Sequence, residues 1–213
     1  MTAPTPEGNS DRQAGWVAAF YPHWVAATGV AMVLLLAYGW VLLPGQPLSI
    51  RAIYLAGPAY MAHQIEEHRG DRFLAYVNRR QFGGRPALTP LISLLVNIPG
   101  VWGTNLIALY AALRWHPGWG LTAVWLMIVN GVVHLIGALR WREYHPGVAT
   151  AALLFLPGGL AALAAIPASH VQQITGLGAA IVLHLVLLAW VSIRVQRMGG
   201  KQAAPGSPMT CSD

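Results

Sequence analysis

Residues 144–193 read YHPGVATAALLFLPGGLAALAAIPASHVQQITGLGAAIVLHLVLLAWVSI and contain no Asp, Glu, Lys or Arg. A helix needs about 20 apolar residues to cross a membrane, so this uncharged stretch of 50 residues holds two crossings rather than one. The best turn within it is Pro167-Ala168-Ser169-His170. The stretch therefore predicts a hairpin of two spans, over 148–166 and 171–195.

Four further apolar runs lie outward from this hairpin, toward the N-terminus. They predict spans over 24–43, 48–68, 88–113 and 118–139. Gly57-Pro58 should kink the second span, and Asn97-Ile98-Pro99-Gly100 should interrupt the third. The predicted fold class is therefore all-α, a polytopic membrane helical bundle of about six transmembrane helices.

The two ends of the chain differ from these apolar runs in composition. Residues 1–15 and 199–213 are rich in Gly, Ala, Pro and polar residues and show no packing pattern. We expect a disordered polar leader and a disordered tail on either side of a single membrane-embedded domain over 16–198.

The composition supports lipid as the main solvent of the chain. Charged residues make up 9% and hydrophobic residues 55%, whereas soluble domains carry roughly 25% charged residues. The net charge of +6 lies in short loops and forms no basic stripe, which argues against nucleic-acid binding. The single Cys211 excludes a disulfide framework and a cysteine metal cluster.

The basic residues favour one side of the predicted bundle. If the N-terminus is inside, only Arg51 and Arg114 are outside, and the inside holds eleven basic residues. These are Arg12, Arg69, Arg72, Arg79, Arg80, Arg85, Arg140, Arg142, Arg194, Arg197 and Lys201. Positive residues concentrate on the cytoplasmic side, so the pattern predicts a multi-pass protein of the cell membrane with both termini cytoplasmic.

Two groups of polar residues lie at similar depth in this apolar background. The second span ends with His63-Gln64-Ile65-Glu66-Glu67. On a helix, residues three and four positions apart share a face, so Glu66 and Glu67 lie on either side of the direction in which His63 points. His134 lies six residues before Arg140, as His63 lies six before Arg69. Both histidines should therefore lie about 9 Å from the same interface, at 1.5 Å per residue.

Histidine and carboxylate ligands without cysteine suit a divalent metal such as zinc, iron or manganese. We predict an inner ligand set of His63, Glu66, Glu67 and His134, with His184 as a possible further ligand. With one ion, either Glu66 or Glu67 remains free as a catalytic general base. With two ions, both would be ligands.

Three further residues are candidates to support the ligands. Asn130 shares a helix face with His134, Asn97 lies in the same layer, and His145 is placed to close the site from the inside. Purely structural roles for all of these candidate residues remain open. The two glutamates would then pair with loop arginines, the histidines would pack or lie in a loop, and Asn97 would satisfy a broken backbone. We expect His68, His23, His116 and His170 to be solvated at the interfaces.

The run His63-Gln64-Ile65-Glu66-Glu67 resembles the motif of the HXXEE family of bacterial membrane proteins. The chain is similar to that family in length, in its several spans and in carrying the motif in the second span. The later pair Asn130 and His134 and the Pro146-Gly147 turn also match. The resemblance implies a bacterial inner-membrane protein with a suspected enzymatic role, and it implies no substrate.

The leading functional hypothesis is a membrane-embedded, metal-dependent enzyme that acts on a lipid or other hydrophobic substrate near the inner leaflet, by hydrolysis or by oxidation. A proton- or ion-coupled small-molecule transporter that uses the same buried carboxylates is the alternative, because Gly57-Pro58 and Asn97–Gly100 are typical of discontinuous helices. A non-catalytic membrane scaffold is the third possibility.

Overall fold

The structure, a computed structural model, describes residues 15–202, and the side chains of residues 15–197. The predicted disorder of residues 1–14 and 203–213 therefore lies outside the described residues. Helix α10 continues to Gln202, past the position where the tail was expected to begin.

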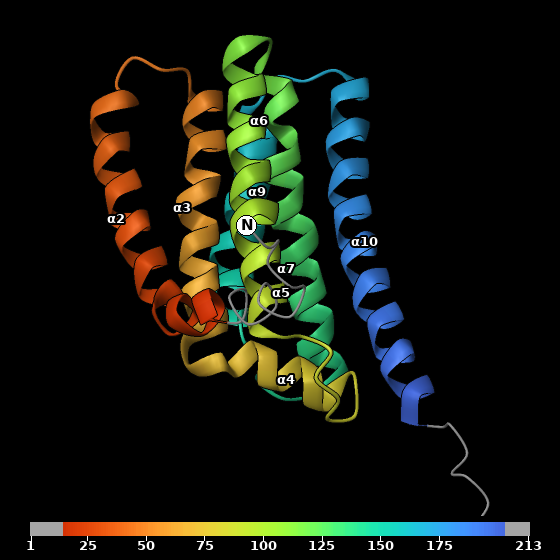
Figure 1. The fold of residues 1–213 in the computed structure, drawn as a ribbon. Coiled ribbons are helices and arrows are strands. Elements are labelled where there is room, and N and C mark those ends of the chain that lie inside the picture. The colour runs from red at the N-terminus through yellow and green to blue at the C-terminus, as the bar shows by residue number, and fades with distance from the viewer. Residues whose placement is uncertain (1–14, 203–213) are drawn as a thin grey trace, which may run out of the picture.

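Residues 15–202 form helices joined by short turns and contain no strand (Figure 1). The α-helices are α2 (Trp24–Leu42), α3 (Leu48–His68), α4 (Arg72–Arg80), α5 (Pro90–Leu95), α6 (Gly103–Arg114), α7 (Leu121–Trp141), α8 (Val148–Thr150), α9 (Leu156–Ala165) and α10 (His170–Gln202). Two π-helical segments are η3 (Val96–Trp102) and η5 (Ala151–Phe155), and three 3-10 turns are η1 (Tyr21–His23), η2 (Arg69–Asp71) and η4 (Pro117–Gly120).

The rods of the bundle are α2, α3, α5–η3–α6, α7, α8–η5–α9 and α10. They stand side by side, and α4 lies across one end of the bundle (Figure 1). Among the described residues, five helices are long and apolar enough to span a membrane, namely 15–42, 90–114, 117–141, 148–165 and 170–197. The sixth rod, α3, is 21 residues long and carries the polar residues of the HXXEE run. The prediction of an all-α multi-pass membrane bundle is confirmed.

The predicted interruption at Asn97–Gly100 is a widened turn rather than a break. Helix α5 passes through the π-helical η3 into α6, with Pro99 inside η3. Proline has no N–H for the α-helical ladder, and a π turn redistributes the freed carbonyl groups. A second π segment, η5, ends before Pro157, which lies in the first turn of α9. Helix α3 instead continues through Pro58 as one helix.

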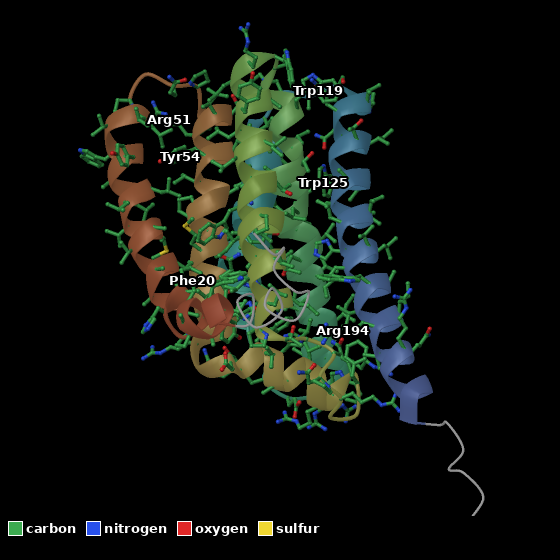
Figure 2. The ribbon with its side chains drawn as sticks, in the orientation of Figure 1. Phe20, Arg51, Tyr54, Trp119, Trp125 and Arg194 are labelled. Atoms are coloured by element: carbon green, nitrogen blue, oxygen red, sulfur yellow. The ribbon has the colours of Figure 1, made fainter. Side chains whose placement is uncertain are left out.

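Helix α3 lies at the centre of the packing and contacts α2, α6, α7 and α9. The largest cluster of buried side chains joins Tyr60, Leu126, Met127 and Phe155 with several alanines. Small residues let the backbones approach closely, which is how membrane helices gain packing energy without a hydrophobic driving force. Tyr54 Oη donates to Leu35 O at 2.7 Å and ties α3 to α2 (Figure 2).

The basic loop after α3 contains a helix that was not predicted. Gly70 and Asp71 take positive φ angles of 69° and 55° and turn the chain into α4. Tyr76 and Val77 are buried beneath the bundle, and Arg80 forms an ion pair with Glu143 of the loop after α7. Helix α4 thus covers the end of the bundle where α3 and α7 finish (Figure 1).

The two ends of the bundle differ in charge. Figure 2 shows Arg51 and Trp119 at one end, and Phe20 and Arg194 toward the end where α4 lies. The α4 end also holds the basic residues of 69–85 and of the end of α7. The strongly basic end is therefore the end that lies nearest to the polar residues of α3.

Candidate functional site

Three side chains from two central helices meet in the interior of the bundle. His63 and Glu67 come from α3 and His134 from α7, with exposed fractions of 1%, 5% and 3%. Glu67 Oε1 lies 3.0 Å from His134 Nε2 and 3.6 Å from His63 Nε2. One ligand atom from each residue lies within 4.8 Å of the other two. We call His63, Glu67 and His134 the polar centre.

The predicted common depth of the two histidines is confirmed. The rings of His63 and His134 lie 4.7 Å apart between centroids and are perpendicular to each other. Aromatic side chains close the centre on its apolar sides, with Phe155 at 4.4 Å from the His63 ring and Phe73 at 5.7 Å from the His134 ring. The polar centre is therefore enclosed in a low-dielectric environment.

The hydrogen bonds of His63 determine which of its nitrogens carries the proton. Thr150 Oγ1 lies 2.7 Å from His63 Nδ1, and the same hydroxyl donates to the Glu66 carboxylate at 2.5 Å. An ionised carboxylate only accepts, so the hydroxyl proton points to Glu66, and Thr150 accepts from His63 Nδ1–H. In the neutral ring His63 Nε2 is then the acceptor nitrogen; it faces Glu67 and has no hydrogen-bond partner among the described residues.

Glu66 does not enter the polar centre. Its carboxylate accepts from the backbone N–H groups of Ala149 and Thr150 at 3.1 and 2.7 Å, and from Tyr144 Oη at 2.5 Å. Burial and this hydrogen bond raise the pKa of Tyr144 to about 12, which keeps the phenol protonated as a donor. The two glutamates thus take different directions, and a ligand or catalytic role for Glu66 stays a prediction.

His145 closes the polar centre from the α4 end. It is buried, and its Nδ1 lies 3.0 Å from His134 Nδ1 and 2.9 Å from the Pro146 carbonyl oxygen. A carbonyl only accepts, so His145 Nδ1 carries a proton and His134 Nδ1 accepts. His134 Nε2–H then donates to Glu67 Oε1. Burial, with His134 nearby, lowers the pKa of His145, which favours its neutral form.

A second polar chain approaches Glu67 from η3. The Trp102 indole can only donate, and it donates to Gln64 Oε1 at 2.7 Å. Gln64 Nε2 then donates to Asn97 Oδ1 at 3.0 Å, and Asn97 Nδ2 lies 3.1 Å from His68 Nε2. This order of donors orients both amides, and His68 Nε2 lies 3.4 Å from Glu67 Oε2. Asn97 thus contacts His68 and not the polar centre itself, and its supporting role stays a prediction.

The expectation that His68 is solvated at the interface is wrong, because α4 and α2 cover it. Its side chain is 4% exposed and packs against Trp24 at 4.8 Å between ring centroids. Gln64 and His68 were missed as polar partners of this site. Their spacing of four residues, on one face of the helix that carries the motif, was the available signal.

His184 and Asn130 lie outside the polar centre. His184 Nδ1 donates to Ala180 O at 2.8 Å within its own helix, and the described metal-ligating group does not include it. Asn130 lies one helical turn before His134, and no described residue hydrogen-bonds its Oδ1. A ligand role for His184 and a supporting role for Asn130 stay predictions.

The residues of the polar centre fit a divalent cation. His63 Nε2 and Glu67 Oε1 face each other at 3.6 Å, beyond hydrogen-bonding distance, and no described residue bonds to His63 Nε2. Two histidines and one carboxylate form a common catalytic ligand set for zinc and for non-haem iron, with coordination positions left open for water or substrate. The proton between His134 and Glu67 would be released on metal binding.

Gly147 allows the loop after α7 to approach the polar centre. Its φ of 92° suits glycine, and an added Cβ would lie 2.7 Å from His134 Cε1, 2.7 Å from His63 Cε1 and 2.8 Å from Glu67 Cγ. Gly147→Ala should therefore destabilise the protein beyond the cost of a left-handed alanine, which is about 1–2 kcal/mol. Thermal unfolding in detergent measures the effect.

Gly45→Ala is the matched control for this substitution. Gly45 also has a positive φ, of 80°, but a Cβ added there would meet no described atom within 4 Å. It therefore reports the backbone cost alone. Equal shifts in melting temperature for the two variants would contradict the close approach of Gly147 to the polar centre.

The comparisons with known proteins agree with the motif. Residues 54–162, just over half of the chain, match the family described as "Protein of unknown function with HXXEE motif". The match includes the residues of the polar centre together with Glu66, Thr150 and His145. No curated protein and no solved structure matches the chain. The chain belongs to the HXXEE-motif family.

Proposed function

We propose that the protein is a membrane-embedded, metal-dependent enzyme that acts on a lipid or other hydrophobic substrate. The observation that carries the proposal is the buried His63 Nε2, which lies 3.6 Å from Glu67 Oε1 and has no hydrogen-bond partner in the described part of the chain. An unmet acceptor beside a buried carboxylate is costly, and a bound cation removes that cost.

Each residue then has a distinct role in the proposed site. The ion is held by His63, Glu67 and His134. The Glu66–Thr150 pair orients His63 through a hydrogen bond to its Nδ1. His145 and His68 are the nearest groups able to exchange protons with the centre. Zinc held here would activate a water molecule for hydrolysis, and iron would supply oxidation chemistry.

The surroundings of the polar centre favour a hydrophobic substrate. Phe155, Tyr60 and Phe73 surround the histidines, and the outer surface of the helices is apolar along their length. A water-soluble substrate would have to leave water to reach a carboxylate at this depth. A lipid-soluble substrate is already in the surrounding phase, so the bilayer can deliver it.

Metal content tests the proposed centre. The protein is purified in mild detergent without a histidine tag, and its metals are quantified by mass spectrometry. We expect about one ion per chain, because three ligands and an open position suit one ion. His63→Ala, Glu67→Ala and His134→Ala should each lose the ion.

His184→Ala is the matched control, since it removes a half-buried histidine whose ring donates to a carbonyl of its own helix. It should retain the metal. Absence of metal from wild-type protein after purification in metal-replete buffer would overturn the proposal. The buried proton between His134 and Glu67 would then favour a proton-coupled carrier, and substrate uptake into proteoliposomes would test that function.

The role of Thr150 is tested by an isosteric change. Thr150→Val removes the hydroxyl that accepts from His63 Nδ1–H, and we expect metal affinity to fall about 10–100-fold, as for other residues that orient a ligand. Thr150→Ser keeps the hydroxyl and should bind metal as wild type does. Competition with a chromophoric chelator measures both affinities, and equal affinity in the valine variant would contradict the orienting role.

We also propose that the α4 end of the bundle faces the cytoplasm, with both termini on that side. The basic residues around α4 support this orientation. A reporter that is active only in the cytoplasm, fused after Asp213, should be active, and the same reporter inserted after Gly45 should be inactive. The reverse pattern would contradict the orientation without affecting the metal centre.

A further inference from the structure

A cleft of about 260 Å³ opens between α3, η3, α7 and α10. Its outer rim consists of large apolar side chains that are exposed on the surface of the bundle, including Leu95, Leu183, Val186 and Trp190. Its inner wall carries Tyr60, Asn130 and His184. The cleft is thus apolar where it meets the lipid and polar at its inner end.

Two polar atoms of the inner wall lack partners. Tyr60 Oη and Asn130 Oδ1 are buried, and neither has a hydrogen-bond partner within the described residues. Each such group costs free energy in an apolar environment, where water does not replace the missing bond. Two unmet groups on one wall indicate a ligand that supplies both bonds.

The inner end of the cleft lies next to the polar centre. Tyr60 precedes His63 by three residues on α3, and their rings lie 6.4 Å apart between centroids. Asn130 precedes His134 by four residues on α7, about one helical turn or 5.4 Å along the axis. Both unpartnered groups are therefore one turn away from a ligand of the proposed metal.

We propose that this cleft binds a long-chain amphiphile with a hydroxyl group, the chain lying along α10 and the hydroxyl between Tyr60 and Asn130. Tyr60 donates and Asn130 Oδ1 accepts. A hydroxyl group is the smallest group that can accept from Tyr60 and also donate to Asn130. This inference rests on the proposed function, for which it names the class of substrate and its route from the bilayer.

A second cleft provides an internal comparison. It measures about 380 Å³ between α2, α3 and α6, and its lining includes Tyr38, Tyr54 and Asn105. Trp102 lies on its wall and is bonded to Gln64, so an indole stands between this cleft and the polar centre. The two clefts face different sides of the bundle, and labelling distinguishes them.

The probe is a long-chain primary alcohol that carries a diazirine near the far end of its chain. It is photolysed with the purified full-length protein in detergent, and the adducts are mapped by mass spectrometry. We expect adducts on the part of α10 between Leu183 and Trp190. Unlabelled long-chain alcohol should compete about tenfold better than its methyl ether, which cannot donate to Asn130.

Leu183→Trp fills the mouth of the cleft and should reduce labelling about tenfold. Leu185→Trp is the matched control, because Leu185 is also exposed on α10 and does not line the cleft. Asn130→Leu should remove the preference of the alcohol over the ether while the chain still binds.

Adducts spread evenly over the lipid-facing helices, adducts in the second cleft, or equal labelling of Leu183→Trp and Leu185→Trp would overturn the inference. Metal content is measured on the same samples. Labelling of the cleft in a protein that binds no metal would leave the cleft assigned and refute the enzyme proposal. Bound metal without specific labelling would refute the cleft assignment and leave the metal centre standing.

Discussion

The structure depends on one buried carboxylate. Glu67 is 5% exposed at the centre of a bundle whose outer surface is apolar, and a lone carboxylate in such a place would be strongly destabilising. Its oxygens are surrounded by His63, His134 and His68, which come from α3 and α7. The two helices must therefore pack with these side chains in register, and the loop after α7 must return close enough to cover them. The polar centre thus constrains the helix packing at this end of the bundle.

The second glutamate of the motif links this centre to the rod formed by α8, η5 and α9. Glu66 accepts from two backbone N–H groups of α8, and through the Thr150 hydroxyl it places a proton on Nδ1 of His63. Neighbouring residues on a helix point about 100° apart, so only one of two adjacent glutamates can face the same partner. The motif therefore directs the Glu67 carboxylate toward His134 and the Glu66 carboxylate toward the backbone of α8. That division explains why the spacing of both glutamates relative to His63 matters for the site.

Much of the fold follows from the sequence because membrane spans depend on local composition. The uncharged stretch 144–193 predicted the last hairpin, and α3 begins and ends where the apolar run does. The meeting of His63 and His134 also followed, since their distances from flanking arginines are equal. Other features depend on tertiary packing. The burial of His68 and the capture of Glu66 by residues 144–150 arise from how the loops fold back over the bundle, and no local pattern encodes that path. Helix α4 was missed although Phe73, Tyr76 and Val77 have the spacing of an amphipathic helix.

The central claim is that His63, Glu67 and His134 converge on a single cation. Crystals of the protein grown in the presence of zinc, with anomalous diffraction recorded on both sides of the zinc absorption edge, test this claim most directly. The account predicts one strong anomalous peak about 2.0–2.1 Å from His63 Nε2 and from His134 Nε2, with Glu67 completing the set. A peak at another place, or an intact hydrogen bond between His134 and Glu67 with no peak beside it, would contradict the claim.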